Sequence, residues 1–474
     1  ELDTLRTVGV DEMWREVSRI RAYFRKHGIK QGDRIAAYLP NIPEATFAFL
    51  AAASLGAVWS CCSQDFGVSS VVDRFAQIEP KLFIAADGYL YNGKKHQRTE
   101  EINAIIAALP CLKDTLVIPY IGTALDTNQI VERDPLVTNL IAKEFNSITP
   151  ENCMKSMFLQ PEKDKFDFEM ADKYIAFGEK HKMFIHGHTL IWHSQMPSWL
   201  SKVKDSVAMS EAMTKHISTV VGKYKGRIGS WDVVNEALNE DGTLRKSVFL
   251  SSYGKDFLTL AFKLAAKADP KTDLYYNDYN LCNAKKRKGA VELVKNLQKN
   301  GAKIDGVGEQ GHWNLITPTL EEIEQTILDF SALGVKVAIT ELDITVLPNP
   351  WDVVGADVSQ RAEASEKMNP YPTALPEDIK IQLAARYEAI FKLFIKHQDK
   401  ISRVTLWGVN DGQSWLNDWP IKGRSNYPLL FDRDFKPKEA YNSVMKLKET
   451  KKKKDTIRSS PNLTSFLLNL DSSV

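Results

Sequence analysis

The sequence has little net charge and no long apolar run. Its 474 residues hold 62 Lys and Arg against 60 Asp and Glu, a formal net charge of +2 at pH 7. Because so small a balance creates no strong field, neither nucleic acid nor a membrane surface is predicted as a partner. The longest nearly apolar run, 45–59, is shorter than the roughly 20 residues that span a bilayer, and it predicts a buried helix. The sequence opens at Glu1 without a basic-then-apolar leader, so it leaves the cellular location open.

Cysteine is scarce as well. The five cysteines are Cys61, Cys62, Cys111, Cys153 and Cys282. Their number is odd, they are scattered, and none stands in a metal-binding spacing such as C-x-x-C. The sequence therefore predicts free thiols and no metal site, and it leaves the redox compartment undetermined.

The composition that remains is that of a globular protein. Hydrophobic residues make up 43% and charged residues 26%, which argues against wholesale disorder and against a fibrous repeat. Single hydrophobic cores stop growing at roughly 250–300 residues, so this length predicts one large domain with appendages, or two domains.

From about residue 116, short β-rich runs alternate eight times with longer amphipathic stretches. Apolar residues recur every three or four positions in these stretches, the spacing of one helix face. Parallel strands with helical crossovers are predicted, and eight such pairs are typical of a (β/α)8 TIM barrel, an α/β fold. The predicted strands are 120–125, 147–154, 184–190, 230–236, 273–280, 306–313, 337–344 and 404–411. The predicted helices are 131–145, 168–181, 211–223, 256–268, 285–299, 320–333, 376–397 and 437–447.

The remaining segments read differently. Residues 1–118 predict a small truncated α/β fragment, residues 120–449 the barrel, and residues 450–474 a disordered tail rich in Lys, Ser, Asn and Thr. Within the first fragment we expect helices at 11–27 and 44–55 and strands at 34–38 and 81–86. The segment 347–375, after the seventh barrel strand, is far longer than ordinary loops, and long loops at this end of a barrel usually carry function.

Two glutamates stand where a barrel carries its chemistry, at the C-terminal ends of strands. Glu236 ends the fourth predicted strand in W-D-V-V-N-E, and Glu341 lies near the end of the seventh in I-T-E-L-D. One of the two could merely be salt-bridged. Cleavage of a glycosidic bond needs a carboxyl group that protonates the leaving oxygen and a second that attacks the sugar or activates water. The residues alone leave open whether the mechanism retains or inverts configuration.

Six separated motifs occur in order along the barrel segment. They are T-P-E-N-C-M-K at 149–155, G-H-T-L-I-W-H at 187–193, W-D-V-V-N-E at 231–236, Y-N-D-Y-N at 276–280, I-T-E-L-D at 339–343 and L-W-G-V-N-D at 406–411. With these motifs the segment from about 121 to 447 resembles glycoside hydrolase family 10, the xylanase family. The resemblance implies a retaining endo-β-1,4-xylanase that acts on xylan or xylo-oligosaccharides as a monomer. It also implies that no cofactor is needed and that the parent enzyme is secreted or periplasmic.

The same resemblance implies a role for each matching residue. Glu236 is the acid/base, Glu341 is the nucleophile, and Asp343 orients His312, which bonds the nucleophile. Asn235 contacts the sugar's 2-hydroxyl. The expected substrate-binding residues are Glu151, Asn152, Lys155, His188, Trp192, Gln195, Tyr279, Gln310, Trp407 and Trp415. A satisfied core position is the competing interpretation for His312, Tyr279 and the tryptophans.

Three features depart from the family pattern. Ser156 stands where a larger residue is common, and Asn410 stands where Thr is frequent. The barrel also enters its first strand without a recognisable preceding helix, which predicts reduced stability of the barrel floor.

The first 118 residues resemble the N-terminal piece of acyl-CoA synthetases close to acetoacetyl-CoA synthetase. The matching motifs are G-D-R-I-A-A-Y-L-P-N-I-P-E-A at 32–45, S-L-G-A-V-W-S at 54–60 and D-R-F-A-Q-I-E-P-K at 73–81. Adenylate formation needs a Ser/Thr/Gly-rich phosphate loop, and the sequence contains none, so the fragment is predicted to be non-functional. Two alternatives to an active xylanase remain at this point: a catalytically impaired carbohydrate-binding barrel in a fused or mis-assembled gene product, and a CoA ligase.

Overall fold

The computed structural model describes residues 7–26, 28–86, 88–91, 94–109, 120–350, 359–455 and 464–467. The chain divides into two compact units. One contains Glu1–Val117 together with Thr450–Val474, and the other contains Ile118–Glu449.

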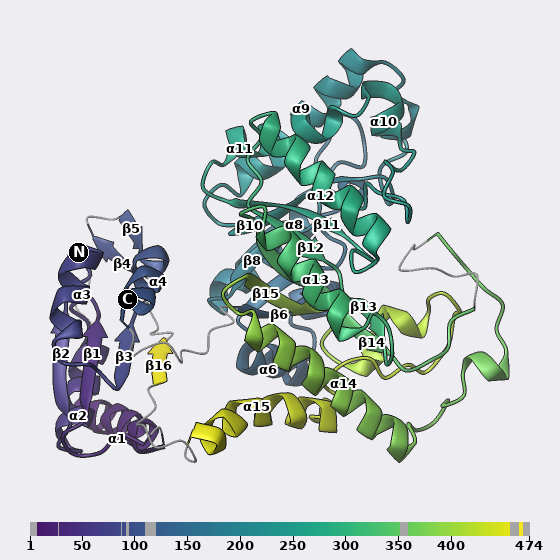
Figure 1. The fold of residues 1–474 in the computed structure, drawn as a ribbon. Helices are drawn as coiled ribbons and strands as arrows, with labels where there is room; N and C mark the ends of the chain where they lie inside the picture. The colour runs from purple at the N-terminus through teal and green to yellow at the C-terminus, as the bar shows by residue number, and fades with distance from the viewer. Residues whose placement is uncertain are drawn as a thin grey trace. The chain divides into compact units, whose positions relative to one another are not determined.

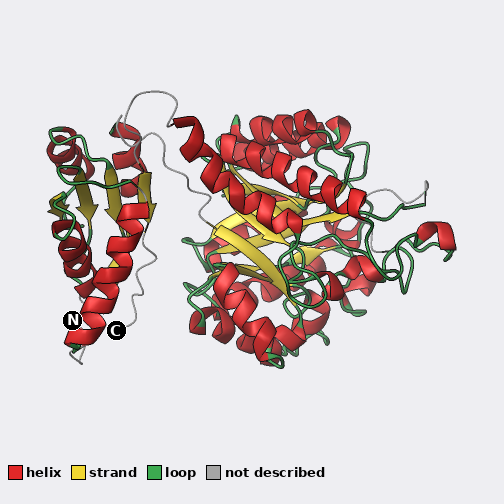
Figure 2. Ribbon diagram, turned by 90° about the horizontal axis from the view of Figure 1, so that it is seen from below, coloured by secondary structure: helices red, strands yellow, loops and turns green. Residues whose placement is uncertain are grey.

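The larger unit is a closed barrel of eight parallel strands, as the sequence predicts. The strands are β6 (Tyr120–Leu125), β7 (Ser147–Pro150), β8 (Phe184–Gly187), β10 (Ser230–Asn235), β11 (Asp273–Asp278), β12 (Gly306–Glu309), β14 (Lys336–Thr345) and β15 (Ile401–Leu406). Each pairs with the next in this order, and β15 pairs with β6 to close the ring. Figure 2 shows the strands in the centre with helices around them. The predicted fold class is confirmed.

The barrel helices follow the strands in alternation (Figure 1). They begin where polar side chains satisfy the free N–H groups of a first turn. Asp205 accepts from the Ala208 amide at the start of α9, and Thr319 forms a capping box with Glu322 at the start of α13. The eight main helices are α6 (Pro135–Glu144), α8 (Glu169–Lys180), α9 (Ser206–Lys223), α11 (Phe257–Ala268), α12 (Ala284–Lys299), α13 (Leu320–Ser331), α14 (Glu377–Lys396) and α15 (Glu439–Asp455).

Several barrel strands end earlier than their apolar pattern predicts, whereas β6 ends at Leu125 as predicted. The predicted strand 184–190 stops at Gly187, and a separate strand β9 (Ile191–Trp192) then pairs with β10. The predicted strand 306–313 is interrupted at Gly311, whose φ of 86° only glycine adopts easily, and resumes as β13 (His312–Asn314) beside β14. The residues that follow these strands therefore lie at the mouth of the barrel. There the side chains no longer alternate between the two faces of a strand.

The long segment 347–375 has little regular structure where it is described. One 3-10 turn, Glu366–Met368, lies within it. Arg424 and Ser425 bind it through the carbonyl groups of Pro348 and Pro372.

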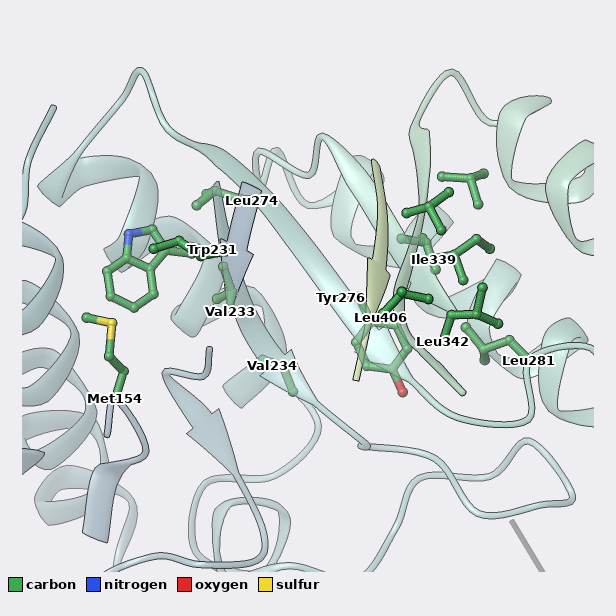
Figure 3. Close-up of a cluster of buried hydrophobic side chains, with 14 of the residues drawn as sticks. Met154, Trp231, Val233, Val234, Leu274, Tyr276, Leu281, Ile339, Leu342 and Leu406 are labelled. Atoms are coloured by element: carbon green, nitrogen blue, oxygen red, sulfur yellow. The ribbon is translucent and has the colours of Figure 1, made fainter. Parts of the chain in front are cut away.

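The barrel core lies between the strands and the helices. Figure 3 shows part of it, with Trp231, Val233 and Leu274 near Met154. Trp231 is almost fully buried, and its ring occupies the space that a side chain at position 187 would need. A Cβ atom on Gly187 would lie 2.2 Å from the Trp231 ring. Tight packing thus requires glycine at this position of β8.

The smaller unit is an α/β sheet with helices on both faces. Its parallel strands are β1 (Arg34–Tyr38), β2 (Val58–Cys62), β3 (Leu82–Ala85) and β16 (Thr464–Leu467), in the order β16-β3-β1-β2. Its helices are α1 (Val10–Lys26), α2 (Pro43–Ala53), α3 (Val68–Ala76) and α4 (Thr99–Ala108), and β4 (Gly88–Tyr91) pairs with β5 (Lys94–Gln97) as a hairpin. One apolar cluster joins α1 and α2 to one face of the sheet, and a second joins α3 and α4 to the other.

Two sequence expectations for these parts need correction. The apolar run 45–59 is not one buried helix, because α2 ends at Ala53, the chain turns at Gly56 with φ 67°, and β2 begins at Val58. In the stretch 450–474, predicted to be disordered, α15 continues to Asp455 and Thr464–Leu467 pairs with β3. The other residues of that stretch, and residues 110–119 before the first barrel strand, lie outside the described part of the chain.

The described cysteines, Cys61, Cys62, Cys153 and Cys282, are all free thiols, as predicted, whereas Cys111 lies outside the described residues. Among the described helices, none is both long and apolar enough to cross a membrane.

We expect Gly187→Ala to lower the free energy of unfolding by about 1–3 kcal/mol or more, because the added methyl group would collide with the Trp231 ring. The matched control is Gly222→Ala in α9, where a Cβ meets nothing within 4 Å. In a helix this control should be neutral or gain about 0.5–1 kcal/mol. Urea unfolding of the three proteins measures both. Equal stabilities for Gly187→Ala and the parent would contradict the packing argument.

Candidate active site

The two glutamates lie at the C-terminal mouth of the barrel. Glu341 is part of β14, and Glu236 directly follows β10. Each is only 5% exposed. Glu236 has a φ of 55°, an uncommon conformation for a residue with a side chain, which ends the strand. Because a buried carboxylate is unfavourable without partners, the groups around each side chain decide its charge.

Glu341 is surrounded by donors. Its Oε1 accepts from Asn277 Nδ2 at 2.8 Å, and its Oε2 lies 3.1 Å from His312 Nε2. The other ring nitrogen of His312 lies 3.0 Å from Asp343 Oδ1, and Asp343 Oδ2 accepts from Trp415 Nε1 at 2.8 Å. Burial works against a charged ring, but Asp343 and Glu341 outweigh it and raise the pKa of His312 to about 10. A protonated His312 donates to both carboxylates.

Glu236 has only neutral donors. Its Oε2 accepts from Trp192 Nε1 at 2.9 Å, and its Oε1 accepts from Gln310 Nε2 at 3.0 Å and from Asn235 Nδ2 at 3.3 Å. Burial is the largest of the causes that raise the pKa of Glu236 to about 7, followed by the charge of Asp278, with Glu341 contributing less. The two glutamates thus meet different environments, the arrangement that divides acid and nucleophile roles between two carboxyl groups.

Asn277 connects the two halves of the site, and the sequence argument did not single it out. Its Nδ2 donates to Glu341 Oε1 and, at 3.0 Å, to Asn235 Oδ1. Thr340 Oγ1 donates to its Oδ1 at 2.7 Å and so fixes the orientation of the amide. The available signal was its place near the end of the fifth barrel strand, inside the motif Y-N-D-Y-N.

Several of the predicted substrate-binding residues gather beside these groups. Lys155 is buried, its Nζ donates to Asn152 Oδ1 at 2.9 Å, and it lies 5.1 Å above the Trp192 ring. Burial raises the pKa of Glu151, which faces Lys155. His188 Nδ1 lies 2.9 Å from Asp232 Oδ2, a partner that the sequence argument missed. Gln195 is partly exposed and has a positive φ of 45°.

Aromatic rings form one wall of the site. Trp407 packs edge-on against His188, with ring centroids 5.7 Å apart. Trp415 lies 4.9 Å from the His312 ring and stacks on Trp419 at 4.6 Å, a partner that the sequence argument also missed. Ring faces of this kind suit the apolar faces of sugars.

Tyr279 differs from the other aromatic residues. It is 3% exposed, Lys286 Nζ lies 3.5 Å above its ring, and Arg245 donates to its hydroxyl. The ring is therefore covered on one face, and its expected role as a platform for the leaving sugar stays a prediction.

Within the described residues, no group of three or more His, Cys, Asp or Glu side chains is arranged to hold a metal ion. The site offers two carboxyl groups, a charged imidazole and a set of amide and indole donors. These groups can perform proton transfer and nucleophilic attack.

Two buried glutamates lie on the fourth and seventh strands of a parallel eight-stranded barrel, one bound by a charged imidazole and an amide and the other by neutral donors alone. This arrangement defines a glycoside hydrolase. The family model of glycosyl hydrolase family 10 matches residues 112–447. The chain belongs to this family, whose members are retaining glycoside hydrolases.

Relatives and solved structures agree over the same region. An endo-1,4-beta-xylanase A of Xylanibacter ruminicola is 43% identical over 354 residues, 73% of this chain and 96% of the relative. An endo-1,4-beta-xylanase of Geobacillus stearothermophilus is 38% identical over 356 residues, which cover 72% of this chain and 99% of the relative. The structure of a family 10 endoxylanase from a sugarcane soil metagenome is 49% identical, with a TM-score of 0.67, covering 69% of this chain and 97% of its own.

The N-terminal region matches another family. Residues 3–154 match the model described as AMP-binding enzyme, which reaches past the smaller unit into the first barrel strands.

Replacing Asn277 should weaken both halves of the site. We expect Asn277→Ala to lower kcat/KM on xylo-oligosaccharides by roughly 10- to 100-fold, because a buried carboxylate and a buried amide each lose a donor. Thr340→Val, which removes a bond to Asn277 but none to a carboxylate, is the graded control and should lose less. A kcat/KM of Asn277→Ala close to that of the parent would contradict this role of the amide.

Proposed function

We propose that this chain is an endo-1,4-β-xylanase that hydrolyses internal β-1,4 bonds of xylan by double displacement, with retention of anomeric configuration. The observation that carries the proposal is the pair of buried glutamates with opposite electrostatic environments at the barrel mouth. The named relatives are endoxylanases, and the match to this chain covers nearly their whole length. One similar solved structure is a mutant in complex with xylotriose.

In the first step Glu341 attacks the anomeric carbon while Glu236 protonates the leaving oxygen. Asn277 and the protonated His312 stabilise the anionic form of Glu341, as a nucleophile requires. Burial keeps Glu236 protonated to about pH 7, as a general acid requires.

In the second step water attacks the anomeric carbon of the glycosyl-enzyme ester. Glu236 takes a proton from this water, and Glu341 is released as a carboxylate. Esterification removes the negative charge of Glu341, which lowers the proton affinity of Glu236 and suits it to act as a base. Both steps use side chains of the protein, and no cofactor is required.

The other residues bind the sugars. Asn235 contacts the 2-hydroxyl of the reacting sugar, and Gln310 holds Glu236 beside it. The glycone side is formed by polar groups and two ring walls: Glu151, Asn152, Lys155, His188, Trp192, Gln195, Trp407 and Trp415. Tyr279 borders the aglycone side. The enzyme acts as a monomer on a substrate found outside cells, without a nucleic-acid or membrane partner.

The N-terminal unit derives from an acyl-CoA synthetase close to acetoacetyl-CoA synthetase and has no activity of its own. The match to the AMP-binding family and the quoted motifs support this origin. The absence of a phosphate loop from the sequence supports the lack of activity. A catalytically impaired carbohydrate-binding barrel is the alternative that the following experiment separates.

Purified chain should release reducing sugars from xylan, and Glu341→Ala should lower kcat by roughly 10⁴-fold or more, because the nucleophile is lost. Glu324→Gln is the matched control, since this carboxylate lies on α13 and binds Lys396 and His397. NMR of the first product should show the β-anomer. A folded parent chain without activity would favour the impaired barrel.

The pH dependence should follow the pKa of Glu236. Because the acid must be protonated, kcat/KM should fall as pH rises through about 7. Glu236→Gln should lack this alkaline limb on an aryl xyloside, whose leaving group needs no protonation. A limb that persists in this variant would assign it to another group.

A further inference from the structure

A buried ion pair at the barrel mouth, Asp278 with Lys286, has no place in the mechanism so far. Asp278 is the last residue of β11 and is fully buried. It follows Asn277, which donates to Glu341, and its carbonyl group accepts from the amide of Gln310 at 3.1 Å. Since the Gln310 side chain donates to Glu236, the end of this strand contacts groups that hold both catalytic glutamates.

The carboxylate of Asp278 has three donors. Lys286 Nζ lies 3.0 Å from its Oδ1, the amide of Tyr279 donates to the same oxygen at 2.9 Å, and the hydroxyl of Tyr276 donates to Oδ2. Burial raises the pKa of Asp278, and Lys286 is the largest influence in the opposite direction. Donors on both oxygens, one of them a cation, fit the ionised form of the group.

Lys286 joins this strand to the loop that follows the acid/base. Its side chain is fully buried, and its Nζ also donates to Glu240 Oε1 at 3.0 Å. Glu240 stands four residues after Glu236. The loop is pressed against α12, because a Cβ on Gly289 would lie 2.3 Å from the carbonyl oxygen of Gly242. One buried ammonium group thus fixes β11, α12 and the loop after Glu236.

Asp278 also acts on Glu236 through its charge. This charge raises the pKa of Glu236, and only burial raises it more. Several other ionisable groups face Glu236 or Asp278 from neighbouring elements. They are Glu341 on β14, Lys155 before α7 (Ser156–Leu159), Arg245 after β10, Tyr276 and Tyr279 around the end of β11, and Lys286 on α12.

We propose that Asp278 is a positioning residue of the reaction, and that its buried ion pair with Lys286 sets the electrostatic surroundings in which Glu236 gives up and takes back its proton. This inference rests on the proposed role of Glu236 as acid/base. It gives the pair a function in catalysis rather than in packing alone.

A matched buried carboxylate stands one strand further along the barrel. Glu309 ends β12, and its partners are the amides of Leu281 and Gly311 and the indole of Trp313. Burial raises the pKa of Glu309 to about 7, and Glu309 shares none of these three donors with Glu236. It therefore serves as a control for burying a carboxylate without the coupling to Glu236.

The test compares Asp278→Asn, the double variant Asp278→Asn with Lys286→Met, and Glu309→Gln. The alkaline limb of kcat/KM on xylo-oligosaccharides should move to lower pH by roughly one unit in Asp278→Asn, because a negative charge near Glu236 is lost. It should move in the same direction but by less in the double variant, which also loses the positive charge of Lys286. In Glu309→Gln the limb should stay in place even if the protein melts earlier. The double variant leaves no buried lysine without its partner, so it reports if Asp278→Asn alone fails to fold.

Carboxyl-carbon NMR of Glu236 in the same proteins reads its titration without any turnover. A midpoint that moves down with the limb supports the proposal. A midpoint and limb unchanged in the Asp278 variants, with only stability lowered, would overturn it. A parent chain inactive on xylan would refute the proposed function, and the NMR titration would still decide the coupling.

Discussion

Two glutamates must be buried in one barrel mouth without taking the same charge, and the site is built around this constraint. Burial raises the pKa of Glu236. Glu341 accepts hydrogen bonds from Asn277 and from His312, a ring that Asp343 keeps protonated. Glu236 receives only neutral donors and faces the charge of Asp278. The difference in donor charge, rather than a difference in exposure, separates the roles of the two groups.

The barrel produces this difference through short breaks in its strands. Gly311, with φ 86°, interrupts the strand between Gln310 and His312. Gln310 therefore donates to Glu236, whereas His312 pairs in register with Asp343 on the next strand and reaches Glu341. A continuous strand would send residues 310 and 312 to the same face. The break at Gly311 thus allows the residues on its two sides, Gln310 and His312, to bind different acids.

Much of this arrangement could be predicted from the sequence. The eight strands and their parallel order follow from periodicity, and the two acids follow from their place at strand ends. Most of the groups around the acids follow from the resemblance to glycoside hydrolase family 10. Several strand ends could not be predicted, because residues such as Leu190 remain apolar after the β8 ladder stops. Asn277, Asp232 and the partner Trp419 were missed because their roles depend on side chains that lie far away in sequence and meet only in the folded barrel.

In the smaller unit, sequence-based prediction missed whole elements rather than only their ends. The strand β2 and the helices α3 and α4 were not predicted. Only Cys62 of the five residues of β2 is buried, whereas α3 and α4 do pack apolar side chains on the sheet. Its first and third strands were predicted because they are fully or almost fully buried and apolar. Sequence periodicity reports burial, so elements with little buried surface leave a weak pattern.

The chemistry of the barrel is complete within its own unit. Every contact described for Glu236 and Glu341, for His312 and its partners, and for the Asp278–Lys286 pair comes from residues inside Ile118–Glu449. The two units also have separate apolar cores. Among the residues that the structure describes, the charge balance that separates acid from nucleophile is therefore built by side chains of the barrel itself.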